Sequence, residues 1–320
     1  MTADVLVREV SLRDGLQIIR TIVPTQDKRE WLDRCITAGL REIEICSFVP
    51  EKYIPQFRDA HEVAAHAVGS RSLVAAALVP NLRGAQRALE AGIPKLVCIV
   101  SATERFSQAN LRRTKLESLD ELRQIVHLRN QYAMQGNRAI LQVGVSVAFG
   151  CPFQGTVADG DVRSTVASAL EAGADEISLA DTAGQGDPAR VRRIFRALLQ
   201  DLGGLPLAAH FHDTRGTGVA NVFAALDAGV RAFDSSIGGL GGCPNSPGAT
   251  GNIATEDLIF MLEAMGLDTG VDLDRLLELR AFVARCLPDV PLFGHIAQVG
   301  VPQGFVRAAE AACRRCEGLK

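Results

Sequence analysis

The chain has 320 residues and a mass of 34.2 kDa, enough for one large domain or two of ordinary size. Hydrophobic residues make up 47% and charged residues 22%, which excludes a disordered chain, because disorder requires low hydrophobicity and high net charge. The formal net charge of −3 argues against a broad basic surface, so we expect no nucleic acid partner.

Membrane and secretion signals are also missing. No run of about eighteen consecutive apolar residues is present, so we expect no membrane-spanning helix. The first residues lack the basic and apolar regions of a signal peptide, and the 8 cysteines are scattered along the chain. These features favour a reduced, cytoplasmic protein.

Eight short apolar runs alternate with amphipathic segments. The runs predict strands at Val5–Val10, Glu42–Ser47, Leu73–Val79, Lys95–Ser101, Ile140–Phe149, Glu176–Asp181, Leu207–Asp213 and Ala232–Ile237. Between them we expect helices at Gln26–Ala38, Leu82–Ala91, Leu119–Met134, Val162–Ala172, Pro188–Leu202 and Val219–Ala228. Four of these segments are followed by a glycine suited to a helix end: Gly39, Gly92, Gly173 and Gly229.

Alternating strands and helices predict a parallel sheet, and eight such units fit a closed (β/α)8 TIM barrel. The alternative is an open doubly wound sheet. It is disfavoured because no G-x-G-x-x-G motif follows the first strand.

The last strand is followed by a glycine-rich loop, residues 238–251, and then by a helix with a capping signal at Thr255-Glu256-Asp257. We expect two further helices, Leu273–Cys286 and Val301–Arg315. We therefore divide the chain into a catalytic barrel, residues 1–268, and a helical C-terminal extension packed on it, residues 269–320.

Polar residues gather at the carboxyl ends of the predicted strands, where barrel enzymes place their active sites. They are Arg13, Asp14, Glu44, Asp181, His210, His212, Cys243 and Asn252. A barrel with a purely structural purpose has no need of this concentration.

The His210-Phe211-His212 segment is the sharpest of these signals. Residues i and i+2 of a strand point to the same face, so both imidazoles can bind one cation. Asp14 from the neighbouring first strand and the Asn252 carbonyl would complete a mixed nitrogen and oxygen ligand set. That set suits Mg²⁺ or Mn²⁺ better than Zn²⁺, although a pair of hydrogen-bonded histidines without metal is the simpler alternative.

Two cysteine patterns differ in meaning. Cys243 lies in the glycine-rich loop, which could bring a thiol over the pocket, although an incidental cysteine is the alternative. Cys313 and Cys316 form a C-x-x-C pair without the partners of a zinc or redox site, so we interpret them as two thiols on a terminal helix.

With these residues in view, the chain resembles the hydroxymethylglutaryl-CoA lyase family of metal-dependent TIM-barrel lyases and synthases. The segments that match are residues 13–17, 43–44, 47–49, 150–153, 176–179, 181–182, 210–214, 234–236, 239–244 and 248–257. The related synthases share the Arg-Asp-Gly and His-x-His elements but lack the loop containing Cys243 and Pro244.

The resemblance implies a function for each matching residue. Asp14, His210, His212 and Asn252 would bind the divalent metal, Arg13 would lie on the thioester oxygen, and Cys243 would be a mobile catalytic thiol. Glu44 and Asp181 would be polar groups in the pocket, and Arg20 and Asn110 would lie near CoA. The resemblance also implies an acyl-CoA substrate and suggests a homodimer.

The implied reaction cleaves 3-hydroxy-3-methylglutaryl-CoA to acetyl-CoA and acetoacetate. The metal would lower the pKa of the substrate hydroxyl, and His210, Asp14 or Asp181 would take its proton. Arg13 would meet the negative charge on the thioester oxygen, and Cys243 could protonate the enolate.

The flanks of the matching segments depart from the family pattern. Ser11-Leu12 replaces Gly-Pro, Ile18-Ile19 replaces a polar pair, Ala180 replaces a glycine and Arg215 replaces an aromatic residue. A citramalyl-CoA or a longer branched 3-hydroxyacyl-CoA is therefore an alternative substrate. An acetyl-CoA condensing synthase and a non-catalytic barrel are the alternative functions.

Overall fold

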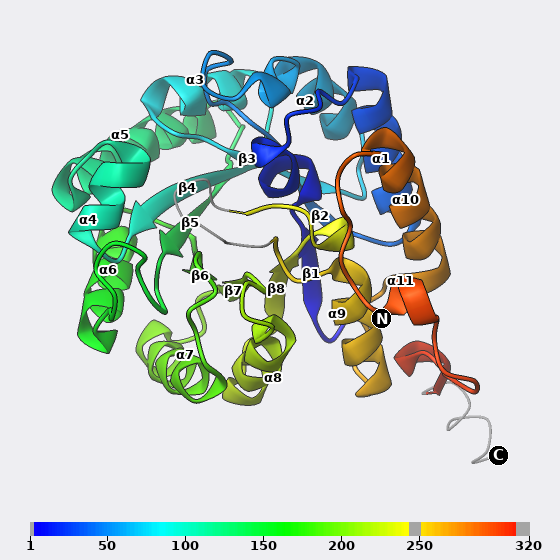
Figure 1. Cartoon of the computed structure of the whole chain (residues 1–320). Coiled ribbons are helices and arrows are strands. Elements are labelled where there is room, and N and C mark those ends of the chain that lie inside the picture. Colours follow the sequence, from blue (N-terminus) through cyan, green and yellow to red (C-terminus); the bar gives the residue numbers. More distant parts are fainter. Residues whose placement is uncertain (1–2, 243–250, 312–320) are drawn as a thin grey trace.

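The closed barrel predicted from the sequence is confirmed. The structure is a computed structural model and describes residues 3–242 and 251–311. Eight parallel strands follow one another around the barrel in chain order, and the last pairs with the first. Helices surround the strands, and the last described residues lie on the side of α9 and α11 (Figure 1).

Each predicted run contains one strand. The strands are β1 (Leu6–Glu9), β2 (Glu42–Ser47), β3 (Val74–Leu78), β4 (Lys95–Ser101), β5 (Ile140–Ser146), β6 (Glu176–Asp181), β7 (Leu207–Phe211) and β8 (Ala232–Ser235). The largest difference from the prediction is in β5, which ends at Ser146 and not at Phe149. Val147 has a φ of 52°, a conformation that no strand continues through.

The helices also follow the predicted order. They are α1 (Thr25–Thr37), α2 (Ala60–Val68), α3 (Leu82–Glu90), α4 (Glu104–Phe106), α5 (Lys115–Met134), α6 (Asp159–Glu171), α7 (Pro188–Leu202), α8 (Gly218–Ala228), α9 (Thr255–Ala264), α10 (Leu273–Cys286) and α11 (Ile296–Val299). Short turns are η1 (Ser11–Gly15), η2 (Leu16–Ile18), η3 (Pro55–Phe57), η4 (Ser107–Leu111) and η5 (Ile237–Gly239). Within the described ranges, no helix has both the length and the apolar character needed to cross a membrane.

The predicted capping signal of α9 is wrong in its detail. Ala254 precedes the helix, and no side chain caps it. The Thr255 hydroxyl donates instead to the buried Glu9 carboxylate at 2.6 Å. The Asp257 carboxylate accepts the backbone N–H groups of His295 and Ile296, so it fastens the C-terminal segment to α9.

The C-terminal extension agrees with the sequence in its first helix only. Helix α10 lies where it was predicted and packs beside α1, with the Arg34 guanidinium 4.7 Å from the centre of the Phe282 ring. The predicted helix Val301–Arg315 is wrong at its start, because helical structure begins only at Ala308. Pro302 and Gly304, whose φ is 83°, interrupt the segment before it.

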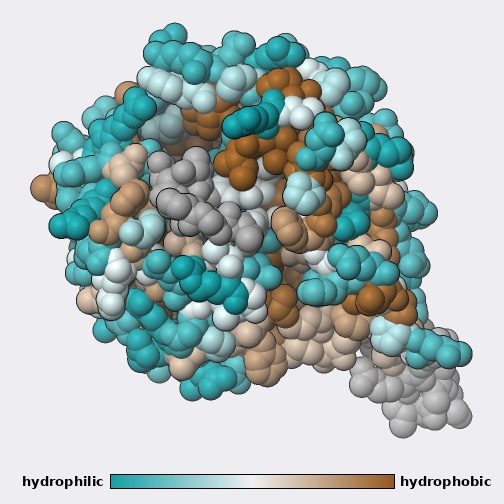
Figure 2. All heavy atoms as spheres, in the orientation of Figure 1, coloured by the Kyte–Doolittle hydropathy of each residue, from teal (hydrophilic) through white to brown (hydrophobic). Residues whose placement is uncertain are grey.

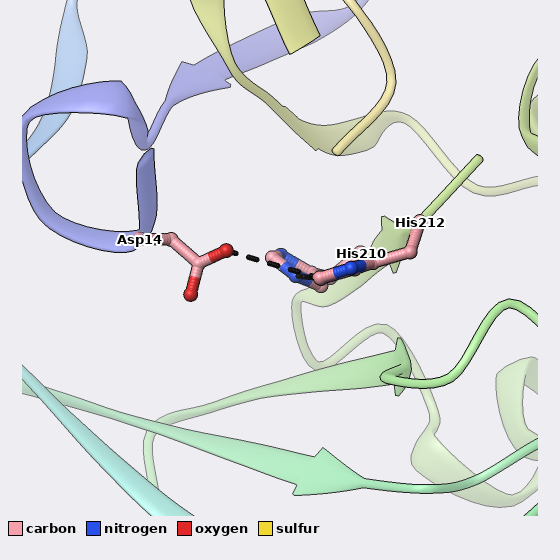
Figure 3. Close-up of side chains that lie close together, drawn as sticks. All are labelled: Asp14, His210 and His212. Carbon is pink, nitrogen blue, oxygen red and sulfur yellow. Dashed lines mark hydrogen bonds and ion pairs between the residues drawn. The ribbon is translucent and has the colours of Figure 1, made fainter. Parts of the chain in front are cut away.

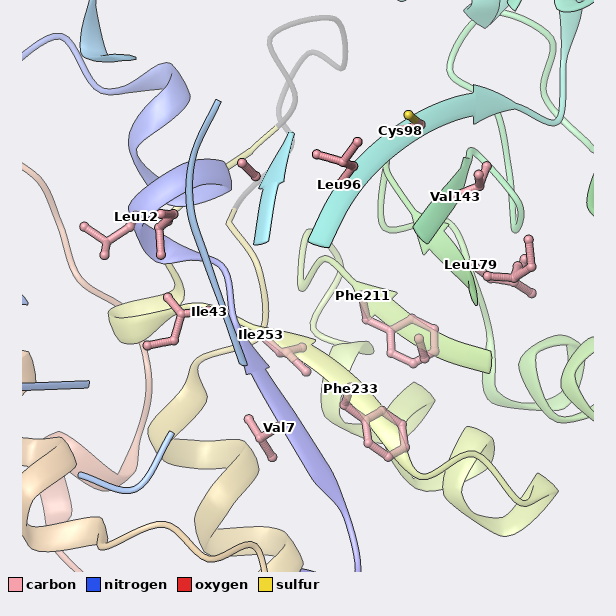
Figure 4. Close-up of a cluster of buried hydrophobic side chains, with 14 of the residues drawn as sticks. Val7, Leu12, Ile43, Leu96, Cys98, Val143, Leu179, Phe211, Phe233 and Ile253 are labelled. Atoms are coloured by element: carbon pink, nitrogen blue, oxygen red, sulfur yellow. The ribbon is translucent and has the colours of Figure 1, made fainter. Parts of the chain in front are cut away.

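The hydrophobic core lies mainly between the barrel and its helices. Outward side chains such as Val7, Ile43, Leu179, Phe211 and Phe233 are buried there (Figure 4). Side chains of the extension, among them those of α10, belong to the same cluster. The division at residues 268 and 269 stays a prediction.

The inside of the barrel holds several charged side chains. Near the amino ends of the strands, the Arg8 guanidinium bonds to Asp234 at 2.6 Å, and Lys95 bonds to Glu42 at 2.6 Å and to Glu176. These buried charges compensate one another, as buried ions must. They form a floor beneath the cavity at the carboxyl ends.

Candidate metal centre and active site

Three of the predicted metal ligands lie together at the carboxyl ends of β1 and β7. One ligand atom from each of Asp14, His210 and His212 lies within 4.8 Å of the other two. The two Nε2 atoms are 3.1 Å apart, and His212 Nε2 lies 3.8 Å from Asp14 Oδ2. Figure 3 shows the carboxylate pointing at the imidazoles. The arrangement is a possible metal site.

Asn252 supports this interpretation. Its Nδ2 donates to Asp14 Oδ2 at 2.7 Å and to the Leu240 carbonyl at 3.0 Å. Its Oδ1 is buried and has no hydrogen-bond partner among the described residues. A buried acceptor without a donor is costly, and a cation is one of the few groups that could satisfy it there. The donor set therefore fits a divalent metal.

The charges around the cluster favour the ionised form of the Asp14 carboxyl group. Burial alone would raise the pKa of Asp14, but Arg13 and both histidines outweigh it and lower that pKa. Burial would lower the pKa of His210, but the hydrogen bond and charge of Asp234 raise it. Asp14 is therefore ionised and available as an anionic ligand.

Arg13 lies beside the metal cluster and lines the cavity. The π-helical turn η1, which the sequence did not predict, carries both Arg13 and Asp14. The guanidinium contacts Asp14 Oδ1 and Glu44 Oε2, each at 2.7 Å. Burial opposes its charge, but these carboxylates outweigh burial and raise the pKa of Arg13. A fixed, fully charged cation thus faces the cavity.

Glu44 also lines the cavity, but Asp181 does not. Residues Ser178 and Ala180 of β6 face the cavity, so the alternation of a strand turns Asp181 away from it. Its carboxylate accepts the backbone N–H groups of Gln185 at 2.8 Å and Gly186 at 2.9 Å. The expectation that Asp181 is a pocket residue is therefore corrected: it holds the loop after β6.

The two residues expected near CoA are placed differently. Asn110, on η4, lines the cavity, and its side chain is exposed. Arg20 is exposed in the segment before α1 and does not line the cavity. Cys243, Cys313 and Cys316 lie outside the described residues.

Asp234 was not among the predicted site residues, and β8 places it inside the barrel. Its Oδ2 lies 3.2 Å from His210 Nδ1, and its Oδ1 accepts from Arg8 at 2.6 Å. The partnership fixes the proton of His210 on Nδ1 and leaves Nε2 facing the cluster. Asp234 pairs in register with His210, so the pairing of β7 with β8, and not a sequence motif, brings the two side chains together.

A cavity of about 790 Å³ joins these residues and opens at the carboxyl ends of the strands. On the same face, hydrophobic residues gather above and to the right of the centre, and hydrophilic ones lie around the rim (Figure 2). This volume lies in the range of pockets that bind small molecules and cofactors. A parallel barrel with a cavity and a carboxylate–imidazole cluster at this end has the form of a barrel enzyme.

The chain belongs to the HMGL-like family, whose model matches residues 5–283. It is 42% identical over 274 residues to hydroxymethylglutaryl-CoA lyase YngG of Bacillus subtilis, covering 86% of this chain and 90% of the relative. It is 37% identical over 300 residues to the (R)-citramalyl-CoA lyase of Chloroflexus aurantiacus, and the match covers 89% of this chain and 92% of that relative. The protein is accordingly a carbon–carbon lyase.

A solved structure agrees with the fold along almost the whole chain. An HMG-CoA lyase from Acinetobacter baumannii, in complex with coenzyme A and 3-methylmalate, superposes with a TM-score of 0.88 at 40% sequence identity. The match covers 96% of this chain and 99% of that one. The resemblance noted from the motifs is confirmed.

Proposed function

We propose that this protein cleaves 3-hydroxy-3-methylglutaryl-CoA to acetyl-CoA and acetoacetate, with a bound divalent metal. The observation that carries the proposal is the cluster of Asp14, His210 and His212 beside the buried, unpartnered Asn252 Oδ1. The names of the relatives in Bacillus subtilis and Acinetobacter baumannii support this substrate.

Asp14, His210, His212 and Asn252 would hold the cation. Two imidazole nitrogens, one carboxylate and one amide oxygen suit Mg²⁺ or Mn²⁺, with water completing the coordination. When bound, the metal supplies positive charge that lowers the pKa of the substrate hydroxyl.

Arg13 would stabilise the enolate that carbon–carbon cleavage leaves on the thioester. Its guanidinium is buried beside the cluster, and Asp14 and Glu44 hold it in place. A preorganised cation in a site of low dielectric stabilises developing negative charge without having to reorient.

The proton of the substrate hydroxyl must go to a group in the cavity. His210 and Asp14 are there, and we propose that one of them accepts it. Asp181 is removed from this set because its side chain faces away from the cavity and is held by the Gln185 and Gly186 amides.

Cys243 is proposed to return a proton to the enolate. Support comes from Gly242, the residue before it, which lines the cavity. Cys243→Ala should therefore cut turnover by about 10²-fold or more, the scale of losing a proton-transfer group, and leave Mn²⁺ affinity intact. Steady-state kinetics and Mn²⁺ titration measure the two effects. Near-normal turnover would return Cys243 to the class of incidental cysteines.

The second candidate substrate is citramalyl-CoA. The Chloroflexus aurantiacus relative favours it, as do the departures from the family pattern on the flanks of the pocket. The test is kcat/KM for both thioesters, with product analysis by chromatography. A higher value for 3-hydroxy-3-methylglutaryl-CoA supports the proposal, and a higher value for citramalyl-CoA replaces it.

Coenzyme A is proposed to contact Asn110 at the cavity rim and Arg20 beyond it. We also propose a cytoplasmic location, which the names of the relatives in rat and mouse support, whereas the relatives in cattle and Arabidopsis thaliana are named mitochondrial. The homodimer expected from the family resemblance stays a prediction.

A further inference from the structure

The cavity has two unlike sides. Around the metal cluster, its walls carry charges and hydroxyls. Across the barrel, β3, β4 and β5 place three apolar side chains and one glycine on the cavity, Leu78, Val97, Ile99 and Gly144, with the polar Gln142 and Ser146 of β5 on either side of Gly144. They are neighbours, because Leu78 pairs in register with Val97 and Ile99 pairs with Gly144. We call these four residues the alkyl wall.

Gly144 is unusual for the middle of a strand, where a glycine weakens the sheet. Its backbone does not require glycine, because its φ is not in the positive region. A Cβ built there would lie 2.9 Å from Ile99 Cδ1 and otherwise meet nothing closer than 3.7 Å. The missing side chain therefore lets the Ile99 side chain lie against β5, and the cavity beside these two residues stays open.

An apolar side chain borders the open part of the cavity at this wall. Ile99 is only partly buried although it lies inside the barrel, so its side chain borders the open cavity. On the outward face of the same strands, Leu96 and Val143 are already covered by the core (Figure 4). The uncovered apolar surface faces the same cavity as His210 and Asp14.

We propose that the alkyl wall receives the alkyl substituent at C3 of the acyl group, and that Gly144 makes room for substituents longer than methyl. The inference rests on the proposed lyase function and specifies its substrate class: 3-hydroxyacyl-CoA thioesters with an extended apolar branch at C3. Each methylene buried against the wall should raise kcat/KM about fourfold, until the space is filled.

The test uses three thioesters with methyl, ethyl and propyl groups at C3 and measures acetyl-CoA release. The wild type should give kcat/KM for the propyl compound at least equal to that for the methyl compound. Gly144→Val fills the space and should lower the propyl-to-methyl ratio by about tenfold or more. Ile99→Ala enlarges the space and should raise the ratio.

Gly160→Val is the matched control, because a Cβ on Gly160 in α6 meets no atom within 4 Å. It should leave the ratio at the wild-type value. Thermal unfolding of each variant shows whether it is folded, and Ile99→Ala tests the wall if Gly144→Val does not fold.

Two results would overturn the inference. One is a wild type that cleaves the methyl compound but rejects the ethyl and propyl compounds, and the other is a ratio that neither variant changes. Failure of the proposed function is distinct from both, since the wild type would then release no acetyl-CoA from any of the three.

Discussion

The two histidines of the metal cluster illustrate what a strand's period of two can predict. Both point inward because they are two residues apart at the end of β7, and Asp14 meets them because β1 lies near β7 in the closed barrel. The same rule, applied to β6, would have turned Asp181 outward. That expectation failed because it used position along the chain without the alternation of faces.

The contacts of Asp234 and Asn252 could not be predicted from the spacing of residues in the sequence. Asp234 matters through a contact across β7 and β8, and Asn252 through one buried oxygen left without a donor. Neither fact is visible in a motif, because each depends on which donors the folded chain brings within hydrogen-bond distance.

Asp234→Asn should weaken metal binding about 10- to 100-fold, the usual effect of removing the partner that orients a metal-binding histidine. The variant keeps an acceptor near His210 Nδ1 but loses the negative charge. Mn²⁺ affinity, measured by titration calorimetry, tests this without turnover. Asp187→Asn makes the same change at the start of α7 and should bind Mn²⁺ normally; equal affinity of the two variants would count against the Asp234–His210 pair.

At the scale of elements, the glycines that end helices were the most reliable signals in the sequence. Gly39, Gly92, Gly173 and Gly229 all have positive φ, between 75° and 114°. The conformation of the C-terminal segment was the least predictable, because it depends on hydrogen bonds to a residue far away in the sequence. Asp257 binds the N–H groups of His295 and Ile296, and no local pattern announces that contact.

Gly39 joins the end of α1 to the extension, and Gly39→Ala should destabilise the fold. A Cβ at Gly39 would lie 2.3 Å from the Gly270 carbonyl oxygen, in addition to the strain of a φ of 102°. Gly136→Ala isolates the strain, because its φ is 91° and its Cβ meets nothing within 4 Å.

The strain alone costs about 1–2 kcal/mol, so Gly39→Ala should lose clearly more unfolding free energy than Gly136→Ala. Chemical denaturation of both variants provides the comparison. If both variants lose the same unfolding free energy, the contact between Gly39 and the Gly270 carbonyl adds nothing to the cost of the substitution.

At the scale of the whole molecule, the sequence predicted a barrel correctly because eight strand–helix units leave few topologies. It did not predict how the barrel and its extension are joined. Glu256 of α9 lies at that junction: its carboxylate accepts the Gly238 N–H and lies 2.7 Å from Arg280 of α10.

Glu256 should make stability depend on pH. Burial raises its pKa from 4.5 to about 7 in the folded protein. The folded state thus holds this proton more tightly than the unfolded state, so the stabilisation is complete below about pH 4.5 and is lost as the pH rises through 7.

Glu256→Gln removes this titration. From pH 5 to pH 8, the unfolding free energy of the wild type should fall by about 1–3 kcal/mol relative to that of the variant. Glu278→Gln, an exposed change on α10, should show no such trend. A difference between wild type and Glu256→Gln that is constant with pH would contradict the assigned pKa.

A metal-dependent lyase site is the feature on which the proposed function depends most. The most direct measurement is acetyl-CoA release from 3-hydroxy-3-methylglutaryl-CoA by protein treated with a chelator, before and after Mg²⁺ or Mn²⁺ is added back. We expect release to stop with the chelator and to recover with either metal. Release that continues at the full rate without metal would contradict the proposed centre of Asp14, His210, His212 and Asn252.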